Sequence, residues 1–175
     1  MKYEVAYLSN SGNTATLAGE LAEMLSEEDI CLTDLSCEEI SEDADVYFIG
    51  FGFNRGMIPV RVLDALEVTE GKTILLFATC GMEPTESYKS FVERKVLPFL
   101  PDNCDYRGLF LCPGQFPDEV VRNLQEVLRH QPDNTQARSL LEQHQKTRRH
   151  PNEDDFENLG NFVWEKLHDL ITPEK

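Results

Sequence analysis

The stretch Ser9-Asn10-Ser11-Gly12-Asn13-Thr14 decides the fold of this chain. It follows the apolar run Val5–Leu8 and opens a helical pattern with leucine at every fourth position from Leu17 to Leu25. A strand, a hydroxyl-rich turn and a helix start in this order gather hydroxyl groups and free backbone N–H groups where the helix dipole attracts an anion. The sequence therefore predicts a phosphate site at the first strand–helix turn.

The chemistry of this turn narrows the kind of phosphate it can hold. It contains no lysine, and a P-loop that binds nucleoside triphosphates needs lysine and a metal ion. Residues 12–19, which open the helix, are also free of carboxylates, although acids normally favour a helix N-terminus. These features favour a single monophosphate bound by neutral donors; an ordinary helix capped by Ser or Asn is the alternative.

The composition limits the function classes. The 175 residues carry a net charge of −16, and no Lys or Arg occurs between Lys2 and Arg55. Repulsion disfavours nucleic acid and anionic membranes, and the acidic surface favours a basic partner, with a plain solvated face as the alternative. No apolar run approaches the roughly 18 residues of a membrane span. The start of the chain does not resemble a signal peptide, so we expect a cytoplasmic protein.

The five cysteines do not suggest a metal centre or a disulfide framework. Their number is odd, they are widely spaced, and they contain no C-x-x-C pair. We therefore expect reduced thiols in or near the core. We single out Cys80 because it stands at the predicted end of a strand beside the expected ligand loops.

Apolar runs alternate with helical patterns along the chain. The runs are short and nearly continuous, as in strands buried on both faces of a parallel sheet: 3–8, 30–33, 46–51, 73–79 and 106–112. Helical patterns follow the first, third and fourth runs, whereas residues 34–45 are weakly periodic and predict a brief or irregular connection. This alternation predicts an α/β fold with a doubly wound, five-stranded parallel sheet.

We expect one domain over residues 1–175. Its core comprises residues 1–114 and a last helix over 152–171, which begins with an Asn cap and covers the sheet. Residues 115–150 form a helical insertion, with one apolar stripe between Val120 and Leu128 and a second helix from about Asn134 to Lys146. The basic run 146–150 is either a docking element or a solvated turn between helices.

Two more loops are expected beside the phosphate loop, because ligands of open parallel sheets bind at the carboxyl ends of the strands. The loop Phe51-Gly52-Phe53-Asn54-Arg55-Gly56 combines glycines, which permit positive φ, with Phe53 as an exposed aromatic for ring stacking or, alternatively, a core residue. The loop Thr79-Cys80-Gly81-Met82 offers backbone amides to a polar ring edge. Because the third strand ends in Ile49-Gly50-Phe51 without an aspartate, a phosphoacceptor receiver domain is disfavoured.

At these residues the chain resembles the flavodoxin family. Ser9-x-Ser11-Gly12-x-Thr14 matches that family's phosphate loop, and the strand–helix series follows its layout. The resemblance implies a flavodoxin-like sheet with strand order 2-1-3-4-5 and FMN as the cofactor. It places the FMN phosphate in the loop Ser9, Asn10, Ser11, Gly12, Asn13 and Thr14. It places the isoalloxazine between Phe51, Gly52, Phe53, Asn54, Arg55 and Gly56 on one side and Thr79, Cys80, Gly81 and Met82 on the other.

The chain also departs from the family pattern. Trp164, the only tryptophan, lies in the last helix, so Phe53, Tyr88 or Met82 would replace the usual aromatic residues at the ring. The resemblance implies an electron-transfer protein that shuttles electrons to or from a basic-surfaced redox protein or reductase. Arg55 near the ring and the added helices favour a flavin-dependent reductase or quinone oxidoreductase as an alternative. A third possibility is a protein-interaction module without a redox role.

Overall fold

The computed structural model describes residues 1–54 and 56–171 and shows a five-stranded parallel sheet with the order β2-β1-β3-β4-β5. The strands are β1 (Lys2–Leu8), β2 (Asp29–Asp34), β3 (Val46–Gly52), β4 (Thr73–Cys80) and β5 (Asp105–Pro113). The helices are α1 (Asn13–Met24), α2 (Val60–Glu67), α3 (Glu86–Val96), α4 (Asp118–His130), α5 (Thr135–Thr147) and α6 (Glu153–Ile171), and a 3₁₀ turn spans Leu97–Phe99. The predicted fold class and strand order are both confirmed.

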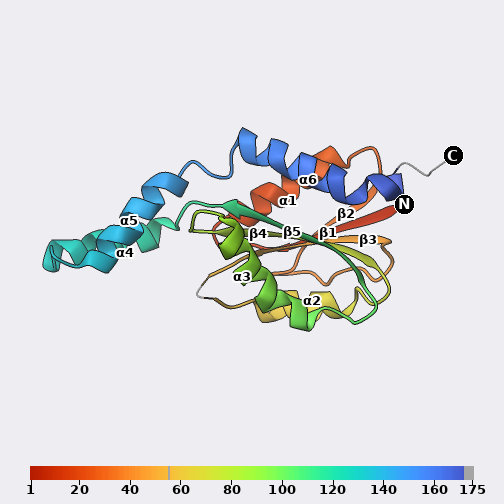
Figure 1. The fold of residues 1–175 in the computed structure, drawn as a ribbon, viewed down its shortest axis with the longest axis horizontal. Coiled ribbons are helices and arrows are strands. Elements are labelled where there is room, and N and C mark those ends of the chain that lie inside the picture. Colours follow the sequence, from red (N-terminus) through yellow and green to blue (C-terminus); the bar gives the residue numbers. More distant parts are fainter. Residues whose placement is uncertain (55, 172–175) are drawn as a thin grey trace.

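Helices cover both faces of the sheet (Figure 1). α1 and α6 pack on one face, where Val5, Phe48 and Leu75 of the sheet meet Leu21 and Leu159 of the helices. α2 and α3 cover the opposite face, whose core includes sheet residues such as Ile49 and Leu76. Continuous apolar runs form β3 and β4 because these strands are buried on both sides.

The outer strand β2 differs from the prediction that every strand is buried on both faces. Cys31 and Leu32 are exposed, and Leu32 keeps 45% of its surface accessible. β2 lies at the edge of the sheet, and no helix connects it to β3. The prediction was wrong for β2 because helices cover the two faces of a sheet less completely at its edge than at its centre.

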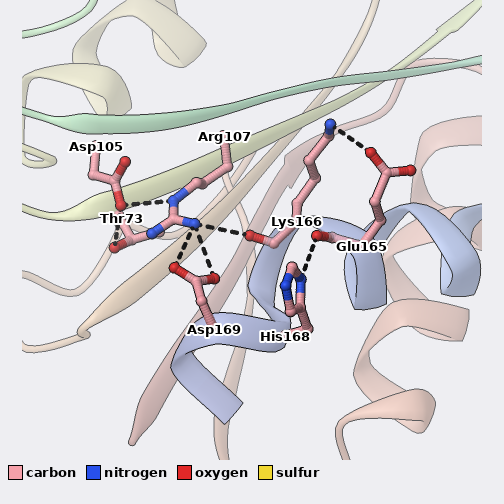
Figure 2. A network of polar contacts seen from close by, with 7 residues as sticks. All are labelled: Thr73, Asp105, Arg107, Glu165, Lys166, His168 and Asp169. Atoms are coloured by element: carbon pink, nitrogen blue, oxygen red, sulfur yellow. Dashed lines mark hydrogen bonds and ion pairs between the residues drawn. The ribbon is translucent and has the colours of Figure 1, made fainter. Parts of the chain in front are cut away.

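Figure 2 shows how the last helix is fixed to the edge of the sheet. Arg107 on β5 donates from Nε to Asp105 at 2.7 Å and from Nη1 to Asp169 at 2.9 Å. Its Nη1 also donates to the backbone carbonyl of Lys166 on α6 at 3.1 Å. The hydrogen bond from Arg107 lowers the pKa of the Asp169 carboxyl, so this carboxylate stays charged in neutral solution.

The predicted cap of α6 is confirmed. The side-chain oxygen of Asn152 accepts from the N–H of Asp154 at 3.0 Å and of Asp155 at 3.4 Å. Asp155 in turn accepts from the N–H of Asn152 at 2.8 Å, which completes a reciprocal cap.

Among the described residues, no helix combines the length and apolarity needed to cross a membrane.

The helical segment expected after the fifth strand consists of α4 and α5, which pack against each other. We call residues 118–147 the α4–α5 hairpin. It leaves the sheet beyond β5 and projects away from the other helices (Figure 1). α4 contains no buried residue, so the hairpin adds little to the core of the protein.

Candidate functional site

The loop after β1 has the geometry of an anion site. Gly12 lies in the left-handed region with φ of 90°, a conformation that favours glycine. The Ser9 hydroxyl accepts from the N–H of Gly12 at 3.1 Å, which holds the turn closed. No side chain caps α1 and its first turn contains no acid, so its N–H groups remain available to a phosphate oxygen.

Thr14 and Thr79 join the first loop to the third. Their hydroxyl oxygens lie 2.9 Å apart in a hydrogen bond, and both side chains are buried. A Cβ placed on Gly52 would lie 3.9 Å from each of these oxygens and 3.8 Å from the Asn54 amide nitrogen. The three predicted loops therefore meet at Gly52, as the sequence analysis expected of neighbouring strand ends.

This pairing changes the expected role of Thr14. We expected its hydroxyl to be a free donor at the phosphate, but it is buried and already bonded to Thr79. The exposed polar side chains of the loop are Asn10 and Ser11, and Ser9 is half-buried. Thr16, which the sequence analysis did not single out, is exposed on the first turn and donates to the Gly12 carbonyl at 3.0 Å.

Asn13 is held by a segment far away in the sequence. Its amide nitrogen donates to the Gln115 carbonyl at 2.9 Å and to the Ser11 hydroxyl at 3.1 Å. Gly114 allows this approach, since a Cβ there would lie 2.5 Å from the same nitrogen. Asn13 is thus a buried brace for the loop and does not present its amide to solvent. Sequence reasoning missed Gly114 and Gln115 because their contact spans about a hundred residues.

The second loop contains a clear correction. Phe53 is 2% exposed and packs edge-on against Tyr88 and Phe91 of α3, so the expected exposed aromatic is absent. Phe51 is also buried. Both phenylalanines stay in the core because α3 covers this face, which leaves Asn54 as the exposed side chain beside Gly52.

Gly56 supports the predicted role of glycine in this loop. It has φ of 73°, and the N–H of Met57 donates to the Asn54 carbonyl at 3.2 Å, which closes a tight turn. Arg55 lies outside the described residues, so its predicted place near the ring stays a prediction.

The third loop begins with the buried thiol of Cys80. The thiol donates to the Met82 carbonyl at 3.3 Å, and burial raises the pKa of Cys80 to about 11. It is therefore uncharged at neutral pH and unsuited to act as a nucleophile. Met82 is 44% exposed and offers a polarizable, apolar contact surface beside the loop.

Gly81 leaves the space that the Phe116 ring occupies at the base of the α4–α5 hairpin. A Cβ at Gly81 would lie 2.4 Å from the ring of Phe116, and this ring packs against His144 of α5 with centroids 5.3 Å apart. Lys146 pairs with Glu83 at 3.6 Å on the surface. The base of the α4–α5 hairpin therefore lies against the first and third loops, while the rest projects away from the sheet (Figure 1).

The basic run 146–150 is partly engaged in structural contacts. His150 lies 2.6 Å from the buried carboxylate of Asp155, and Thr147 is buried. Arg148 and Arg149 are exposed. These contacts fit a connection between helices, which was one of the two interpretations of this run.

Two grooves flank the loops and the sheet. One, of about 390 Å³, lies between the third loop, α3 and α5 and is lined by Met82, Tyr88, Phe91 and Gln143, among others. The other, of about 230 Å³, is strongly acidic and is lined by Glu38, Glu39, Glu42 and Asp64 together with Arg61. The first groove is lined in part by apolar and aromatic side chains, whereas carboxylates dominate the second.

Comparison with known proteins agrees with this geometry. The flavodoxin domain model matches residues 4–164, and the chain belongs to this family. A flavodoxin-like domain-containing protein, BilS, from Clostridioides difficile is 29% identical over 168 residues, which cover 93% of this chain and 94% of the relative.

Two solved structures share the fold at low sequence identity. The short-chain flavodoxin associated with a non-canonical PDU bacterial microcompartment has a TM-score of 0.60, with 15% identity and coverage of 98% of this chain and 99% of the other. Oxidised flavodoxin 2 from Bacillus cereus has a TM-score of 0.56, with 14% identity and coverage of 97% and 99%.

Proposed function

We propose that this protein binds FMN and transfers electrons to or from a protein partner in the cytoplasm. The observation that carries the proposal is the convergence of three strand-end loops on Gly52, beside a helix N-terminus that is free of acid. Membership of the flavodoxin family supports the choice of FMN. The likeness to a flavodoxin solved in its oxidised form supports a redox role.

The described residues fit the phosphate of FMN better than they fit its ring. Ser9, Ser11 and the first-turn N–H groups of α1 would hold the phosphate without a lysine. Asn54, Gly52 and Met82 would border the ring, with Met82 as the exposed apolar contact. In the described parts of loops 51–56 and 79–82, no exposed aromatic side chain is available to stack on it.

FMN, when bound, would supply the electron-transfer chemistry, and the protein would position it and restrict access to it. The Thr14–Thr79 hydrogen bond fixes the first and third loops relative to each other. The N–H of Phe53 donates to the Thr79 carbonyl at 2.8 Å, which fixes the second loop as well. A preset site of this kind lowers the ordering cost of binding a planar ligand.

The acidic surface fits the proposed partner. Glu38, Glu39 and Glu42, which line the acidic groove, belong to residues 3–54, a segment that contains no Lys or Arg. Opposite charge would steer a basic-surfaced redox protein toward this molecule and raise the association rate at low salt. A fall in the rate of electron exchange with rising ionic strength is the expected signature.

The cofactor assignment is tested by titration with FMN and with riboflavin, which lacks the phosphate. Ala15→Asp adds a carboxylate to the first turn of α1, where it stabilises the helix but repels a phosphate. We expect FMN affinity to fall at least about tenfold while riboflavin affinity is retained. Gly19→Asp, one turn further along the same helix, is the matched control.

If the protein does not bind FMN in this titration, the assignment of FMN as the cofactor is wrong. A protein-interaction module without a redox role is then favoured. If Ala15→Asp lowers the affinities for FMN and for riboflavin equally, the carboxylate acts on the fold of the loop and the phosphate lies elsewhere.

A flavin-dependent reductase is the second candidate, and the groove of about 390 Å³ favours it. Met82 belongs both to this groove and to the third loop, so a flat acceptor bound there would lie near the ring. Steady NAD(P)H oxidation in the presence of a quinone would identify a reductase. Reversible photoreduction without such turnover, followed by reoxidation by a redox protein, would identify a carrier.

A further inference from the structure

The α4–α5 hairpin has an apolar seam that the described structure covers only in part. Val121, Leu124 and Leu128 are half-buried and form the side of α4 that packs on α5, the helix it contacts. Val120 and Val127 lie on the adjacent side and are 41% and 38% exposed. α4 therefore presents two apolar seams that share Leu124, and α5 covers only one of them.

The exposed seam has the spacing of a helix-pairing surface. Val120, Leu124 and Val127 are separated by four and then three residues, which is the repeat that lets one helix pack along another. The hairpin projects from the sheet (Figure 1), and Val120 and Val127 are exposed, so a further helix can approach this side of α4. Two helices alone seldom bury enough apolar surface, whereas four helices enclose a core.

The charges of α4 indicate which helix fits. Its first turn is acidic, with Asp118 and Glu119, and its last turn is basic, with Arg129 and His130. If a second α4 lies antiparallel, so that Val120 faces Val127 of the second copy, each acidic end meets a basic end. In this arrangement α4 is complementary to itself, end to end, under a two-fold axis.

The charge of the whole molecule favours this surface for self-association. Residues 118–147 contain four Lys or Arg and five Asp or Glu, a net charge of −1. The rest of the chain contains 12 Lys or Arg and 27 Asp or Glu, a net charge of −15. Two copies that met through the rest of the molecule would on average bring acidic surfaces together, whereas the hairpins meet almost without net repulsion.

We propose that two copies of this chain associate through their α4–α5 hairpins to form an antiparallel four-helix bundle. The bundle places the two sheets at opposite ends, because each α4 begins at its own sheet and points away from it (Figure 1). This inference does not depend on the proposed FMN binding, since the seam and its charges lie on the hairpin alone.

Sedimentation equilibrium of the full chain over about a hundredfold range of concentration tests the proposal. The mean mass is expected to rise from the monomer value of 20.0 kDa toward twice that value. The double variant V120E/V127E is expected to remain monomeric at every concentration. V60E is the matched control, because Val60 on α2 is a valine that is 70% exposed outside the hairpin, and this variant should still associate.

Charge reversal tests the antiparallel register. H130E places an acid on the flank of the seam that also carries Glu119, against the acidic first turn of the second copy, and should weaken association at least tenfold. The variant D118R/E119R should weaken it similarly, and the combination of all three changes should restore it. A parent protein that stays monomeric throughout, or dimers that survive V120E/V127E, would overturn the proposal. Circular dichroism with unchanged helix content shows that each variant is folded.

Discussion

The sheet and the α4–α5 hairpin both contain apolar stripes, but the two regions are held together differently. Strands β3 and β4 are buried along nearly their whole length, and Ile49 and Leu76 have no exposed surface. In the hairpin, α4 has no buried residue and α5 has only Ala137 and Thr147. The comparison shows that an amphipathic pattern predicts a helix but does not show whether its apolar side is covered within the same chain.

The largest expected difference concerns stability. Leu76→Ala should lower the free energy of unfolding by about 2–5 kcal/mol, since it opens a cavity in a fully buried core. Leu124→Ala, at a half-buried position, should cost less than about 1.5 kcal/mol. Chemical denaturation at a low protein concentration measures both. Equal costs would show that the hairpin is as integral to the fold as the sheet.

The next largest effect on stability is expected at the hydrogen bond between Thr14 and Thr79, which joins the first and third loops. Thr14→Val should cost about 1–3 kcal/mol, because it leaves the buried Thr79 hydroxyl without its partner. The double variant T14V/T79V should recover most of this loss, since it removes both polar groups together. Chemical denaturation measures the free energy of unfolding of both variants. Thr16→Val, at an exposed position, is the control. No recovery in the double variant would assign the cost to packing.

Glu4 is a buried acidic residue in the sheet, so the well-packed sheet also contains a destabilising position. It is 1% exposed on β1, and its Oε1 has no hydrogen-bond partner among the described residues. Burial raises the pKa of Glu4. The protonated form is therefore favoured in the folded protein, and its stabilising effect is present below the unfolded pKa near 4.5 and is lost as the pH rises.

Glu4→Gln should consequently raise stability at pH 7 by about 1 kcal/mol, and the gain should shrink toward pH 4. Thermal or chemical denaturation at several pH values provides the measurement. Glu27→Gln, an exposed position with the same change of charge, is the control and should show no such pH dependence. A gain at pH 7 that is unchanged at pH 4 would contradict the assignment to the Glu4 carboxyl.

The smallest effect is expected where the hairpin meets the third loop at the surface. Lys146→Ala removes the exposed ion pair with Glu83 and should change stability by less than about 0.5 kcal/mol. Gly81→Ala, in contrast, forces the Phe116 ring away from its seat and should loosen the base of the hairpin. The rate of limited proteolysis at the turn between α4 and α5 compares the two variants. Faster cleavage in Lys146→Ala would show that the ion pair holds the hairpin against the third loop.

Much of the fold could be read from local patterns. The apolar runs that became β1, β3 and β4 and the Asn cap of α6 are local signals, and each was confirmed by the structure. The edge strand β2 was misjudged because its run of Ile30–Thr33 has the same composition as a buried strand. Position in the sheet, which no local pattern carries, determines how much of a strand is covered.

The site was predictable in outline, and its side-chain roles were not. The turn Ser9–Thr14 and the glycines at Gly12 and Gly56 follow from residue types that only certain turns accept. The burial of Phe53, in contrast, depends on Tyr88 and Phe91 of a helix further along the chain. An aromatic residue in a loop is exposed or buried according to which element packs over it.

The sequence by itself determined that this chain forms a doubly wound sheet with a tight, hydroxyl-rich turn at its first strand end, because the period of apolar residues and the residues of a tight turn act over short distances. Only the tertiary structure decided that Thr14 bonds to Thr79, that Gln115 braces Asn13, and that one seam of α4 stays uncovered. These features join residues far apart in the chain, and their partners are selected by packing geometry that appears once the sheet and its helices have assembled.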